Sequence, residues 1–111
     1  MPKKKVAVIG YGIASYGALS PEVSYKEMMY EACSRAYQMA GVNPRKDVDS
    51  FVTCSEDFDE GTSIFDEYVP DQIGGMLRPV HTITGDGLQG VAAGVMQILT
   101  KHFDVVVVEA H

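Results

Sequence analysis

Residues 81–90 read HTITGDGLQG, a short β-type run followed by a tight glycine turn and the start of a helix. A strand that ends in such a turn presents one side chain at the carboxyl edge of a sheet, beside the positive end of the helix dipole. The turn therefore predicts an α/β domain and makes Thr84 the first candidate for a functional position. A threonine hydroxyl has no accessible anion near neutral pH, so it needs a base before it can attack a substrate. The simpler interpretation is that Thr84 or Asp86 only caps the helix.

The patterns on either side of this turn alternate between strand and helix. Short runs rich in apolar residues predict strands at residues 5–10, 48–54, 79–83 and 104–110. Apolar residues at helical spacing predict helices that start near Ser24 and Leu88, and a short further helix is predicted at 62–68. Because strands alternate with helices, we expect one mostly parallel sheet with helices on both faces, in a single domain spanning residues 1–111.

Several local features refine this picture. Ser24 and Glu27 have the spacing of a capping box, and Gly41 is a predicted C-cap of the same helix. The unbroken run of valines at 105–108 predicts a strand buried on both faces, and Leu99 is expected on the inner face of the helix before it. A buried strand at the end of the sequence leaves a sheet edge uncovered, which favours a fragment or a subunit that needs a partner chain.

Composition and charge exclude several classes of function. The chain has 111 residues, 46% of them hydrophobic, and a formal net charge of -6. Its basic residues cluster only at Lys3-Lys4-Lys5, so we expect no binding of nucleic acid. No apolar run reaches membrane-spanning length and no secretory signal is readable, so we expect a cytoplasmic protein without membrane association.

The cysteines and acidic residues offer few ligand sets. Two cysteines far apart in the sequence do not form a disulfide framework or a zinc site, so reduced thiols are expected. Cys33 lies on the apolar stripe of the first helix and is predicted to be in the core. Cys54 stands at the carboxyl end of a strand, where α/β sites gather, so it is an alternative reactive thiol, with core packing as the competing interpretation. The acidic stretch around Asp57 and Gly61 does not fit the frame of a calcium loop, so we expect no metal.

The first strand is followed by Gly10-Tyr11-Gly12, which matches the beginning of a dinucleotide-binding turn. In that motif the helix starts at the glycines and its N-terminus holds the pyrophosphate. Here Ser20-Pro21 intervenes before the helix near Ser24, and Ser15 stands where the third glycine is expected. We therefore expect a strand-exit loop that needs positive φ, and we keep a nucleotide-binding α/β domain as a further alternative.

Three segments carry a longer pattern: the opening 6–12, the small-residue helix start at 87–91 and the valine-rich strand at 103–109. Together with Ala40-Gly41-Val42 and Asp47-Val48-Asp49, they resemble the N-terminal part of the thiolase superfamily. The similarity is strongest to archaeal thiolase-like proteins of the lipid-transfer type and to acetyl-CoA acetyltransferases. It covers nearly all of the sequence, but only the first part of a family chain.

The resemblance implies a thiolase-like half-domain that acts on acyl-CoA thioesters, by acyl transfer and carbon–carbon bond formation or cleavage, and that is incomplete by itself. It places the family's nucleophilic cysteine at Thr84, so the ordinary mechanism cannot run through this position. His81, His102 and His111 do not match the family's bases, which belong to a later half. Implied partners are acyl-CoA and a second copy or a thiolase-like partner chain, with no cofactor beyond the coenzyme A of the substrate. A non-catalytic scaffold or acyl-CoA-binding subunit is the alternative.

Overall fold

The sheet is parallel and has three strands in the order β2-β1-β3. The computed structural model describes residues 5–14, 17, 19, 21–55 and 70–111. Within these residues β1 spans Ser50–Ser55, β2 spans Val80–Thr84 and β3 spans Val106–Ala110. Phe51 is in register with Val80 on one side and with Val107 on the other. The order places β1 in the centre, which explains why every one of its residues is buried.

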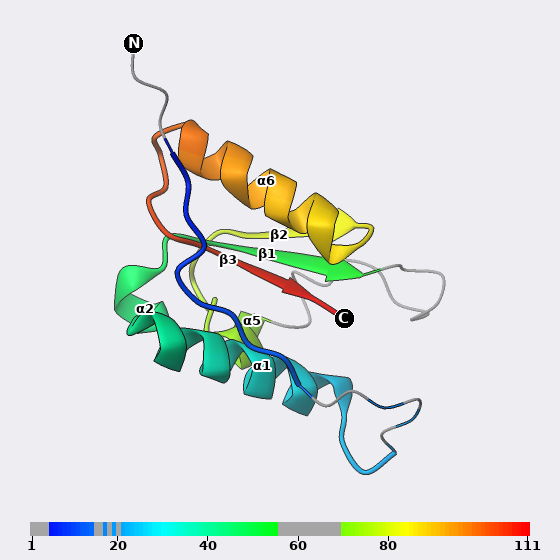
Figure 1. Ribbon diagram of the computed structural model, residues 1–111. Coiled ribbons are helices and arrows are strands. Elements are labelled where there is room, and N and C mark those ends of the chain that lie inside the picture. The colour runs from blue at the N-terminus through cyan, green and yellow to red at the C-terminus, as the bar shows by residue number, and fades with distance from the viewer. Residues whose placement is uncertain (1–4, 15–16, 18, 20, 56–69) are drawn as a thin grey trace.

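Helices cover both faces of this sheet (Figure 1). α1 (Tyr25–Ala40) and the short α5 (Pro70–Ile73) lie on one face, while α6 (Gly87–Leu99) lies on the other. A single turn of helix, α2 (Pro44–Asp47), leads from α1 towards β1. The predicted α/β class with a parallel sheet and helices on both faces is confirmed.

The boundaries of α1 are set by local side chains. Ser24 Oγ accepts a hydrogen bond from the Glu27 amide at 3.2 Å, and Glu27 Oε2 accepts one from the Ser24 amide at 2.9 Å. These contacts satisfy two backbone donors that the first helical turn leaves open. Gly41 ends the helix in the left-handed conformation with a φ of 69°. The capping box and the C-cap are therefore confirmed.

Each face of the sheet has its own packing. On the α1 face, Phe51 of β1 lies in a buried cluster, whose other members are Met29, Cys33, Val48 and Ile73. On the α6 face, the buried glycines Gly90 and Gly94 bring the helix backbone close to the strands. The prediction that Cys33 belongs to the core is confirmed.

The strand predicted at residues 5–10 is wrong. The segment runs alongside β3 (Figure 1), but no backbone hydrogen bond joins the two among the described residues. Val8 is 82% exposed and Ile9 is 57% exposed. The segment packs on α1 instead of joining the sheet. Its backbone at Gly10 lies so close to this helix that an added side-chain carbon would lie only 2.7 Å from the Ala36 carbonyl oxygen. Its apolar character predicted a burial that Val8 and Ile9 do not have, since no strand among the described residues pairs with the segment.

Two packing expectations also need correction. The valines at 105–108 were expected to be buried on both faces, but all four are half-buried. The reason is that β3 is an edge strand, with a neighbour on one side only. Leu99 is 46% exposed, so it is not on the inner face of α6. The helix predicted at 62–68 lies outside the described residues.

Candidate functional site

The carboxyl ends of the three strands meet at one edge of the sheet, because all strands are parallel. Ser55 and Thr84 are in register at this edge, and Cys54 is in register with Ala110. Ligand sites of open α/β sheets lie at such an edge. Both predicted residues, Thr84 and Cys54, lie at this edge, and their side-chain orientation and burial there determine whether they can form a site.

The turn between β2 and α6 is closed by its own polar groups. The Gly85 amide donates to the Ser55 carbonyl at 3.2 Å. Asp86 Oδ1 accepts from the amides of Leu88 at 3.0 Å and Gln89 at 3.1 Å, and Gln89 Oε1 accepts from the Asp86 amide at 3.2 Å. The cap is thus Asp86 and not Thr84. The Asp86 carboxylate already accepts from the first free amides of α6. An external anion therefore has no free amide to bind at this helix start and is repelled by the carboxylate.

Thr84 is the last residue of β2 and is exposed. Successive side chains of a strand point to opposite faces. Cys54 packs against α6, so its register partner Ile83 shares the α6 face, and Thr84 belongs to the α1 face with Ser55. The threonine hydroxyl therefore leaves the sheet on the side away from the helix start. Its assignment as the nucleophile position stays a prediction of the resemblance.

Cys54 is fully buried under the first turns of α6. Burial raises the pKa of its thiol to about 11, and the carboxylates of Glu109 and Asp86 act in the same direction, while a hydrogen bond to the Gly90 backbone lowers it. A thiol with this pKa is protonated at neutral pH, and a protonated thiol is a poor nucleophile. The geometry of Cys54 is that of a packing residue in the β1–α6 interface.

A pair of residues at the end of β3 was missed by sequence reasoning. Glu109 is buried, and its Oε1 lies 3.1 Å from Nδ1 of His111. The His111 ring stacks on Tyr25 with 5.6 Å between ring centroids. A carboxylate at this distance orients the imidazole ring. The only available signal was the spacing of two residues along a strand, which places both on the same face.

Glu109 and His111 also line an open cavity of about 420 Å³ between β3 and the start of α1. Its other walls are mostly apolar and include Met28 and Met29. On the same sheet face, the Oγ1 atoms of Thr53 and Thr82 lie 3.4 Å apart. Ser55 next to them is buried, and its Oγ has no hydrogen-bond partner in the described part of the chain. Polar groups therefore gather on the α1 face of the carboxyl edge, in addition to those that cap α6.

The glycines of residues 10–12 are explained by packing. Positive φ is found for Gly41 and Gly74 among the described glycines, and not for Gly10 or Gly12, so the expected positive-φ loop is wrong. A side chain at Gly12 would lie 2.8 Å from the Ala36 amide nitrogen, so both glycines permit close approach to α1. This contact leaves no open loop at the glycines for a pyrophosphate, and the nucleotide-binding alternative loses its main support.

No helix among the described residues has the length and apolar character needed to cross a membrane. No protein-family model matches the sequence, and no curated protein matches it.

The structure is similar to a solved one, the 3-oxoacyl-[acyl-carrier-protein] synthase III from Aquifex aeolicus VF5. The TM-score is 0.68 over 82% of this chain, with 14% sequence identity. The fold is thiolase-like. The chain spans about a third of the synthase, since the match covers 31% of that protein. At this identity the similarity shows the thiolase-like fold.

Proposed function

We propose that this chain is one part of a thiolase-like acyltransferase acting on acyl-CoA thioesters, completed by polypeptide outside these 111 residues. The observation that carries the proposal is the likeness to a synthase named for a 3-oxoacyl product, over 82% of this chain. The strand–turn–helix of β2 and α6 at the carboxyl edge of the sheet supports it. A cytoplasmic location and assembly into an oligomer belong to the same proposal, and the two free cysteines fit a reducing compartment.

The chemistry of the turn limits what this part does. An acyl-enzyme needs an activated nucleophile, and the turn offers the neutral hydroxyl of Thr84 and the buried, protonated thiol of Cys54. Asp86 adds a negative charge at the start of α6, and its carboxylate already accepts from the first free amides of that helix. We therefore propose that neither residue forms an acyl-enzyme in the chain as it stands.

The test is the intact mass of the chain after incubation with acetyl-CoA. The wild-type chain should gain no acetyl group. Thr84→Cys restores a thiol at the edge of the sheet and should be acetylated in a saturable manner, at least about tenfold faster than a thiol without bound substrate. Thr100→Cys is the matched control, because it makes the same change at an exposed residue at the opposite end of α6. Equal, unsaturable rates for the two variants would contradict an acyl-CoA site at this edge.

A non-catalytic scaffold or acyl-CoA-binding subunit is the second candidate, and Asp86 is the observation that favours it. A carboxylate that caps α6 stabilises the helix but opposes binding of an anionic intermediate. Calorimetric titration with acetyl-CoA separates the two candidates. Saturable binding without acetylation of Thr84→Cys would support the scaffold, whereas acetylation of that variant would support the acyltransferase part.

A further inference from the structure

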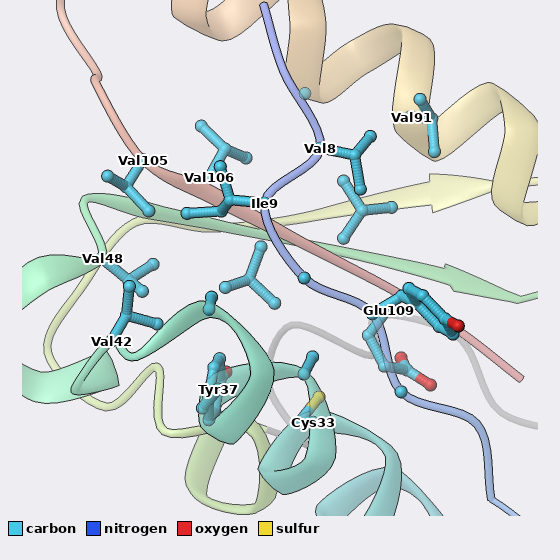
Figure 2. Close-up of a pocket in the computed structure, with 18 of the residues that line it drawn as sticks. Val8, Ile9, Cys33, Tyr37, Val42, Val48, Val91, Val105, Val106 and Glu109 are labelled. Carbon is cyan, nitrogen blue, oxygen red and sulfur yellow. The ribbon is translucent and has the colours of Figure 1, made fainter.

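The paired side chains of Glu109 and His111 have no role in the proposed function, although their geometry is that of a general base. Nδ1 of His111 lies 3.1 Å from Glu109 Oε1 and 3.4 Å from Oε2. The two residues are two positions apart along an extended chain, so their side chains leave it on the same face. Figure 2 shows the Glu109 side chain extending from β3 towards α1, and the cavity of about 420 Å³ described above lies on that side.

The carboxylate determines which ring nitrogen of His111 carries a hydrogen. An ionised carboxylate accepts hydrogen bonds and donates none, so Nδ1 is the donor in this pair. In the neutral ring the lone pair then belongs to Nε2. This is the tautomer in which a histidine held by a carboxylate takes a proton from a nucleophile.

Further contacts hold the imidazole ring in place. It stacks on the ring of Tyr25, with 5.6 Å between the centroids and 14° between the planes. The His111 amide donates to the Cys54 carbonyl at 3.1 Å, so the backbone at this residue still follows the sheet. Glu109 is buried, which strengthens its hydrogen bond to the ring. A base that is fixed in this way loses little orientational freedom when it reacts.

The cavity beside the pair suits a small acyl group. Its volume of about 420 Å³ falls in the range of ligand sites in proteins. Ile13, Met28, Met29 and Ala32 give it apolar walls, and methionine side chains adapt readily to an aliphatic chain. Among the described residues that line it there is no lysine or arginine, so the cavity offers no cationic side chain of that kind to a phosphate.

We propose that Glu109 and His111 form a general base with which the chain hydrolyses short acyl thioesters. Nε2 of His111 takes a proton from a water molecule while the water oxygen attacks the thioester carbonyl carbon. The tetrahedral intermediate then collapses with cleavage of its carbon–sulfur bond, and the imidazolium gives the proton to the leaving sulfur. The products are a carboxylic acid and a thiol. His111 acts on the attacking water, and Glu109 is a positioning residue.

This reaction goes beyond the proposed function, because no side chain of the protein is acylated and neither Thr84 nor Cys54 takes part. The choice of a thioester as substrate rests on the proposed function. The base itself rests only on the geometry at the end of β3.

The test measures release of free thiol from two substrates by the 111-residue chain. One substrate is acetyl-CoA, and the other is S-acetyl-N-acetylcysteamine, which carries the same thioester without the nucleotide. Ellman's reagent detects the thiol, since both cysteines of the chain are buried. His111→Gln should lower kcat/KM by at least about a hundredfold. The matched control His102→Gln changes an exposed histidine outside the cavity and should leave the rate as it is.

Two further variants separate a base from a merely structural role. Glu109→Gln keeps the size of the side chain, but its amide can hold the ring in either tautomer, so kcat should fall by about tenfold or more with KM unchanged. His111→Ala should regain activity in a saturable manner when imidazole is added. His102→Ala with the same imidazole gives the background rate.

The proposal is overturned if neither substrate is hydrolysed, if His111→Gln is as active as the wild type, or if imidazole restores nothing to His111→Ala. Should acetyl-CoA still bind in calorimetric titration in these cases, the proposed function stands without the base. Hydrolysis of the shorter thioester alone, still dependent on His111, would support the base and count against acyl-CoA as the substrate.

Discussion

Gly90→Ala should destabilise the domain even though alanine is the better helix former. Gly90 is in the interior of α6, where alanine improves helix propensity by about 1 kcal/mol. The same methyl group would lie 2.9 Å from Val108 Cγ1 and closer still to Cys54 Sγ. Cys54 is fully buried in the central strand, so its sulfur cannot swing away without moving backbone. Overpacking of a core costs about 1–3 kcal/mol, and the approach here favours the upper end.

The net expectation is a loss of about 2 kcal/mol in the free energy of unfolding, after the gain in helix propensity is subtracted. For a domain of this size that corresponds to a fall in Tm of roughly 8–16 °C. Urea denaturation followed by circular dichroism measures the free energy, and calorimetry measures Tm. The effect is attributed to one contact, between residue 90 and Cys54. The double variant Gly90→Ala/Cys54→Ala should therefore lose less free energy of unfolding than the two single variants lose together, by at least about 1 kcal/mol.

Gly94→Ala is the matched control in the same helix. Its methyl group would lie 3.0 Å from Val108 Cγ2 and 3.5 Å from Val106 Cγ1. These valines are half-buried on an edge strand and can adjust, so the change should be close to neutral. If Gly90→Ala is as stable as the wild type, or if the double variant shows no coupling, the close packing of α6 on β1 is refuted.

Three further changes test the carboxyl edge. Asp86→Ala should lower the free energy of unfolding by about 1 kcal/mol in urea denaturation, and Asp86→Asn, which keeps a capping oxygen, should cost less; equal losses would contradict the cap. Iodoacetamide should label Cys54 slowly at pH 8 in the folded chain and rapidly in urea, because burial keeps this thiol protonated. Labelling is mapped by peptide mass, and fast labelling of Cys54 in the folded chain would contradict its burial under α6. Stability should fall as pH rises from about 9 towards 11. Burial raises the pKa of Cys33 to about 12 and that of Cys54 to about 11, so the unfolded chain releases protons over this range that the folded chain retains. A urea midpoint that stays constant from pH 9 to 11 would contradict this prediction.

Features that depend on neighbouring residues could be predicted from the sequence. The capping box of Ser24 and Glu27, the C-cap at Gly41 and the strand–turn–helix around Gly85 each involve residues within a few positions of one another. The alternation of apolar strands and amphipathic helices similarly predicts a parallel sheet between two helical layers. The buried cluster around Phe51, including Cys33, follows once these layers are packed together.

Features that depend on distant partners were decided by the tertiary structure. The apolar run at 5–10 indicates burial, but only its neighbours determine whether it pairs, and the contact of Gly10 and Gly12 with α1 holds it apart from β3. The register of β2 with β1 places Thr84 on the face away from α6, which no spacing within the turn reveals. Sequence alone therefore determined the three strands of the sheet, the two long helices and their caps, because these are set by local hydrogen bonds and side-chain periodicity. The edges of the sheet and the environment of Cys54 were decided only in three dimensions, because each is formed by segments that are far apart in the chain.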